Sequence, residues 1–138
     1  MVGESNLERL ARNMNPTLSA TPFVYCLFVD FQVPNGVQPI CLFRESEGLT
    51  AIVEKAQAEQ FALPHKFEAA QITLNVHSDL QAVGFLASVA QRLSAADISC
   101  NVVSAYMHDH LFVPADRADE AMAILGKVQY AQAGINSG

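Results

Sequence analysis

Hydrophobic residues along the chain follow two kinds of periodic pattern. Apolar side chains at every second position are typical of strands, and spacings of three and four indicate amphipathic helices. On these patterns, helped by Gly, Pro and Asn turn signals, we expect strands over 22–33, 39–45, 47–54, 66–77, 98–107 and 110–114. We expect helices over 5–14, 55–63, 79–96 and 116–128, followed by a frayed tail.

The order of these elements predicts an α+β sandwich of antiparallel sheets with helices on one sheet face. The second half follows the order strand, helix, strand, strand, helix. In the first half a PNG turn at 34–36 suggests that strand 39–45 lies antiparallel to strand 22–33. We expect the break between two units near residues 64–68.

Composition narrows the classes of protein to consider. The chain has 138 residues, of which 51% are hydrophobic and 16% charged, so it can bury a core and an oligomer interface. A net charge of −6 argues against nucleic-acid binding. We expect no membrane span and no secretory signal. The cysteines Cys26, Cys41 and Cys100 lie far apart, which favours a reduced, cytoplasmic protein.

The segment VHSDLQAVGF, residues 76–85, joins an expected strand to the longest expected helix. Ser78 and Gln81 fit a helix capping box, which accounts for both side chains without any function. The amides at such a helix start could also bind a carboxylate. Gly84 would allow a ligand, or a packed strand, to approach the backbone closely.

Residues 72–125, with VHSDLQAVGFLA and ISCNVVSAYMHDHLFVP, resemble an ACT domain, the small amino-acid-sensing module. With RESEGLT at 44–50, nearly the whole chain is similar to small bacterial proteins built from two ACT-like halves. Two features depart from the usual ACT pattern. Residues 77–84 replace a shorter acidic loop, and Asp97 stands where a glycine is common, although Asp tolerates the left-handed conformation.

The resemblance implies two ferredoxin-like half-domains, at 1–65 and 66–138, in a non-enzymatic regulatory protein without a cofactor. It implies an oligomer, with a dimer the simplest form, that binds an amino acid or another small carboxylate. From the helix start and the neighbouring strand we expect the ligand to contact His77, Ser78, Asp79, Ala82, Val83, Gly84, Asn101 and Ser104.

Two other functions compete with the sensor. One is a ligand-free interaction or dimerisation module, because the expected hairpin over 98–114 is apolar on both faces and needs cover on both. The other is a metal-dependent enzyme using His77, His108, Asp109 and His110. We expect no metal site, since a two-residue tip at His108 and Asp109 would keep these side chains from converging.

Overall fold

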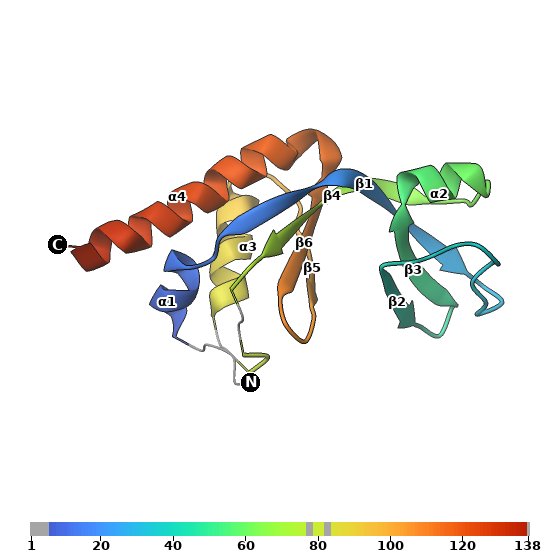
Figure 1. Ribbon diagram of the computed structural model, residues 1–138, viewed down its shortest axis with the longest axis horizontal. Coiled ribbons are helices and arrows are strands. Elements are labelled where there is room, and N and C mark those ends of the chain that lie inside the picture. The colour runs from blue at the N-terminus through green and yellow to red at the C-terminus, as the bar shows by residue number, and fades with distance from the viewer. Residues whose placement is uncertain (1–5, 77–78, 82–83, 138) are drawn as a thin grey trace. The chain divides into compact units, whose positions relative to one another are not determined.

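The computed structural model describes residues 6–76, 79–81 and 84–137, and it has the expected α+β fold (Figure 1). Its helices are α1 (Leu7–Arg12), α2 (Lys55–Gln60), α3 (Phe85–Ala95), the short 3-10 turn η1 (Ala115–Arg117) and α4 (Ala118–Ser137). Its strands are β1 (Pro16–Phe28), β2 (Cys41–Arg44), β3 (Leu49–Glu54), β4 (Lys66–Leu74), β5 (Asn101–Ser104) and β6 (Asp109–Pro114).

The strands hydrogen-bond in the order β2-β3-β1-β4-β6-β5. The chain divides into two compact units: unit 1 holds residues 1–19 and 70–138, and unit 2 holds residues 20–69. Both unit boundaries fall inside long strands, β1 and β4, so each of these strands contributes to both units. Unit 1 therefore has the order β1-β4-β6-β5 and unit 2 the order β2-β3-β1-β4, a four-stranded sheet in each case.

Unit 1 buries its core between its strands and three helices. The side chains of Ile72 and Leu74 on β4 and of Leu111 and Val113 on β6 are fully buried. They pack with residues of α1, α3 and α4 in one cluster, so the helices cover one face of these strands (Figure 1). The buried strand residues alternate along β4 and β6, and Ala118, Ala121 and Leu125 of α4 follow at spacings of three and four. Both periods place the apolar side chains on the faces that pack together.

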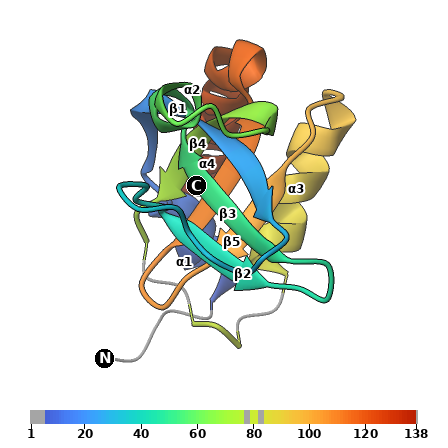
Figure 2. The same cartoon turned by 90° about the vertical axis from the view of Figure 1, so that its right-hand side faces the viewer.

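Unit 2 has a smaller core and a single short helix. Val24 and Cys26 of β1 and Ala51 and Val53 of β3 are buried with Ala58 of α2. The register pairs Val24 with Val53 and Cys26 with Ala51, so these side chains share one face of the sheet. In unit 2, α2 follows β3 directly (Figure 2). Residues 29–40, between β1 and β2, form no helix.

One expected strand pairing is wrong. β2 pairs antiparallel with β3, from Cys41 opposite Ile52 to Arg44 opposite Leu49, and does not neighbour β1. The turn that joins β2 to β3 is short, closed by a bond from the Glu45 amide to the Gly48 carbonyl (2.8 Å). Twelve residues separate β1 from β2, so the tighter hairpin prevails.

Several element bounds also differ from expectation: β1 ends at Phe28 instead of 33, β4 ends at Leu74 instead of 77, and β5 spans Asn101–Ser104 instead of 98–107. β1 begins six residues earlier, at Pro16, because its polar first half is held by strand pairing and not by side-chain burial. α3 begins at Phe85 and not at residue 79. α4 runs on to Ser137 instead of ending at 128. The expected left-handed conformation of Asp97 is confirmed, with φ at 61°. No helix in the described ranges is long and apolar enough to cross a membrane.

Candidate functional site

Helix α3 starts without a side-chain cap. Its N-cap residue is Gly84, in the left-handed conformation at φ 92°, and the first helical bond runs from the Ser88 amide to the Gly84 carbonyl (2.9 Å). The first amides of a helix have no partner within the helix and carry the positive end of its dipole. The backbone at residues 85–87 can therefore receive an anionic group.

A pocket of about 90 Å³ opens at this helix start. Two of its lining residues come from the hairpin of β5 and β6, where Ser104 and Asp109 are register partners. Asp109 is buried, at 3% exposed, on the face of β6 that also carries Leu111 and Val113. Among the residues that the structure describes, the lining is Asp79, Leu80, Gly84, Phe85, Leu86, Ala87, Ser104 and Asp109.

This pocket brings together three of the residues expected to bind a ligand, namely Asp79, Gly84 and Ser104. Asn101 is opposite Phe112 in the ladder and lies on the other sheet face from Ser104, so it is not part of the pocket. His77, Ser78, Ala82 and Val83 lie outside the described residues.

The capping box at Ser78 and Gln81 does not start the helix. The side chain of Asp79 accepts a bond from the Gln81 amide (2.9 Å), which forms a turn ahead of the helix. Spacings of three and four along the expected helix 79–96 would place Leu80 on its apolar side, but Leu80 is 64% exposed. Phe85, Val89 and Leu93 form the buried stripe instead.

The sequence pattern predicts Asp109 at a two-residue hairpin tip, and this prediction is wrong. The tip is the four-residue loop 105–108, closed by the Ala105 amide on the His108 carbonyl (3.0 Å), and Asp109 is the first residue of β6. The alternation of Asp109, Leu111 and Val113 was the available signal for its inward position.

The pocket can bind a positively charged group and a negatively charged group of one ligand. Carboxylates of Asp79 and Asp109 can accept from an ammonium group, and helix amides can donate to a carboxylate. An α-amino acid carries these two groups on a single carbon atom. The volume equals that of about three water molecules, so the pocket suits this head group, with a side chain extending outward.

The two histidine rings of the HDH segment, His108 and His110, lie with their centroids 6.5 Å apart. Among the described residues, no three His, Cys, Asp or Glu side chains are grouped to hold a metal ion. The ring of His110 instead lies beside β4, with its Nδ1 atom 3.0 Å from Thr73 Oγ1 and 3.2 Å from Gln71 Nε2. Burial and the neighbouring His108 lower the pKa of His110, and Asp109 opposes this.

Two ACT domain family models match the chain, one over residues 2–70 and the other over residues 66–127. A comparison with curated proteins found no match. A solved protein of unknown function from Vibrio cholerae, described as a possible transport protein, is 38% identical, with a TM-score of 0.78. The similarity covers 89% of this chain and 95% of that protein.

Two more distant solved structures share the fold. The ligand-free regulatory subunit of aspartate kinase from Thermus thermophilus is 10% identical, with a TM-score of 0.63 over 82% of this chain and 95% of that one. A protein from Agrobacterium tumefaciens is 18% identical, with a TM-score of 0.64 over 78% of this chain and 81% of that one. On the family matches and the Vibrio relative, this chain belongs to the ACT domain family.

Proposed function

We propose that this protein is a non-enzymatic regulatory module that binds a small α-amino acid at the start of α3. The observation that carries the proposal is the pocket in which the uncapped helix start faces the carboxylates of Asp79 and Asp109. The kinship with ACT domains and with a regulatory subunit of aspartate kinase supports a ligand-binding regulatory role.

The experiment is a thermal-shift and calorimetric screen of the twenty common amino acids against the whole chain. A ligand at 100 times its dissociation constant should stabilise the fold by about 2.7 kcal/mol. Asp79→Asn should abolish the shift, because it removes a carboxylate that receives the ammonium group. Asp30→Asn, on an exposed loop of unit 2, is the matched control and should keep it. A screen in which no amino acid stabilises the wild type contradicts the proposal.

A second proposal concerns assembly through β2. This strand lies at the edge of the sheet, and its Leu42 and Phe43 are 49% and 67% exposed. An edge strand with exposed apolar side chains is a template for pairing with another chain. We propose a homodimer in which β2 strands pair, tested by light scattering of the wild type and of Phe43→Lys. A wild type that is monomeric at high micromolar concentration contradicts it.

The proposed location is the cytoplasm. All three cysteines are unpaired, as a reducing compartment would keep them. Fractionation of cells that express the full-length protein, with a periplasmic and a membrane marker beside it, would test the location.

A further inference from the structure

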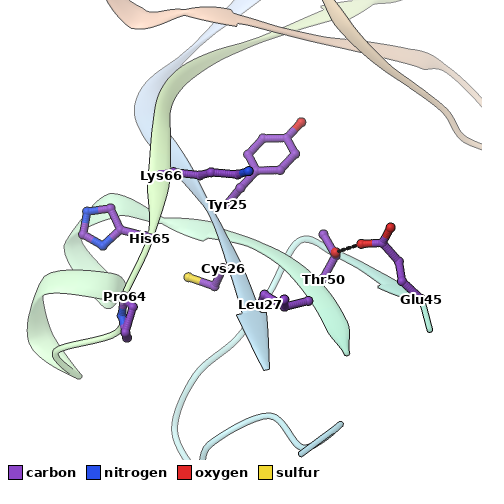
Figure 3. A pocket seen from close by; sticks show the side chains of 8 residues that line it. All are labelled: Tyr25, Cys26, Leu27, Glu45, Thr50, Pro64, His65 and Lys66. Atoms are coloured by element: carbon purple, nitrogen blue, oxygen red, sulfur yellow. Dashed lines mark hydrogen bonds between the residues drawn. The ribbon is translucent and has the colours of Figure 1, made fainter. Parts of the chain in front are cut away.

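Unit 2 contains a pocket larger than the one at α3. Its volume is about 520 Å³, within the range of roughly 300–1,000 Å³ that is typical of small-molecule sites. Every lining residue lies in unit 2, and none was singled out from the sequence as a ligand contact. Figure 3 shows the eight lining side chains: Tyr25, Cys26, Leu27, Glu45, Thr50, Pro64, His65 and Lys66.

The middle of the pocket is apolar and belongs to β1. Leu27 is 47% exposed and leaves apolar surface for a ligand. The Tyr25 ring packs against the Phe67 ring, with centroids 5.7 Å apart. Phe67 adopts the left-handed conformation at φ 61°, rare for a bulky residue, so the backbone is held in a costly conformation beside this wall.

One side of the pocket is cationic. Lys66 is exposed and, within the described part of the chain, takes part in no ion pair, whereas Lys55 nearby in sequence is paired with Glu68. A lysine ammonium group binds a carboxylate as a compact charge with three donors. His65 stands next to it, with its Nδ1 atom bonded to the Leu63 carbonyl (2.8 Å). Because a carbonyl only accepts, Nδ1 holds the proton, and Nε2 remains for a ligand.

The other side of the pocket is anionic. The hydroxyl group of Thr50 on β3 donates to the carboxylate of Glu45, which follows β2. This bond orients the carboxylate and leaves its second oxygen able to accept. Since β1 lies between β3 and β4, Tyr25 and Leu27 separate the Glu45 side from the Lys66 side, as Figure 3 shows.

We propose that this pocket is a second ligand site, for a small molecule with an apolar body that carries a carboxylate at one end and an amine at the other. The carboxylate binds Lys66, the amine binds Glu45, and the body lies on Tyr25 and Leu27. A free α-amino acid bears both groups on one carbon and cannot reach both sides. Short apolar peptides and ω-amino acids carry the two groups at opposite ends of the molecule, and their binding here is independent of the site at α3.

The test uses nuclear magnetic resonance titration of the whole isotope-labelled chain with three probes: L-leucyl-L-leucine, 6-aminohexanoate and L-leucine. We expect one or both of the first two to shift the signals of Tyr25, Leu27 and Thr50, and L-leucine to leave them in place. If only the peptide binds, the natural ligand is a peptide. If 6-aminohexanoate also binds, the site accepts any apolar molecule with a carboxylate at one end and an amine at the other. If neither of the two binds, or if L-leucine binds there equally well, the proposal is wrong.

Two variants of surface residues locate the contacts. Lys66→Met and Glu45→Gln should each weaken binding about tenfold or more, because each removes a charged hydrogen-bond partner. Lys127→Met, at an exposed lysine on α4, is the matched control and should bind like the wild type. Unchanged affinity in both pocket variants overturns the proposal. Asp79→Asn, which removes a carboxylate of the α3 pocket, should leave the peptide titration unaffected, and this keeps the result separate from the fate of the α3 site.

Discussion

The side-chain amide of Asn75 donates to the Asn15 carbonyl at 2.8 Å, so the end of β4 is tied to the residue before β1. The same nitrogen lies 2.9 Å from Thr17 Oγ1, and the Asn75 backbone amide bonds the Met14 carbonyl (2.9 Å). Residues 60 positions apart are thereby joined within unit 1. Asn75 fixes the register at which the start of the chain enters the sheet.

Asn75→Ala should lower the free energy of unfolding by about 1 kcal/mol, because the exposed side chain loses its bonds to Asn15 and Thr17 while the backbone bond persists. Chemical denaturation measures this value. Asn101→Ala, at an exposed asparagine of β5, is the control, with an expected change within about 0.5 kcal/mol. Equal losses in the two variants would show that the Asn15 link contributes nothing.

Gly84 and Gly126 form a matched pair for backbone strain. A Cβ atom at either position meets no other atom within 4 Å, but only Gly84 has a positive φ, of 92°. Gly84→Ala should therefore cost about 1–2 kcal/mol through the left-handed backbone alone. Gly126→Ala, inside α4, should stabilise the fold by about 0.5–1 kcal/mol. Thermal denaturation of both variants gives the comparison, and a stabilising Gly84→Ala would mean that this backbone is not left-handed.

The sequence predicted most elements because their hydrophobic periods are strong. The stripe Ala118, Ala121 and Leu125 of α4 and the alternation of Ile72 and Leu74 in β4 are local signals, and both are confirmed. The start of α3 was missed because the capping box at Ser78 is also a local signal, and it outweighed Gly84 in the prediction. A glycine in the left-handed conformation ends the turn and sets the helix start, which no periodicity reveals.

The sites depend on contacts between distant segments. Asp109 lies at the start of α3 only because a four-residue loop sets its register opposite Ser104. The polar segment HDH is equally compatible with a hairpin tip, so the sequence does not fix this register. The pocket of unit 2 collects Tyr25, Thr50 and Lys66 from three strands. The strand order brings these residues close together. The sequence predicts this order incorrectly, because it pairs β2 with β1 and the structure pairs β2 with β3.

The pKa of His110 should lie below the ordinary value of 6.5, because burial disfavours the charged ring and His108 adds repulsion. The amide nitrogen of Gln71 can only donate, so the His110 Nδ1 atom accepts from it and a proton there would break the bond. Nuclear magnetic resonance titration of the ring measures the pKa. His108→Gln should raise it, and a wild-type value at or above 6.5 would contradict this environment.

This shift also sets a pH dependence of stability. The unfolded ring binds its proton at a higher pH than the folded ring, so the unfolded state takes up a proton first as the solution is acidified. The contribution of His110 is therefore fully present above about pH 6.5 and declines as the pH falls toward the folded pKa. Denaturation curves of wild type and His110→Gln should converge on acidification. Parallel curves would rule out the linkage.

Cys100 should be unreactive in the folded protein, because burial raises its pKa from 9.0 to about 11. Only the thiolate attacks alkylating reagents. A pKa of about 11 instead of 9.0 reduces the thiolate fraction at pH 8 about a hundredfold. A Cys26→Ala, Cys41→Ser variant isolates this thiol, and iodoacetamide labelling followed by mass spectrometry gives its rate. The same variant unfolded in guanidinium is the control and should label about a hundredfold faster. The folded rate should rise about tenfold per pH unit up to roughly pH 11, whereas a plateau near pH 9 would show a solvated thiol.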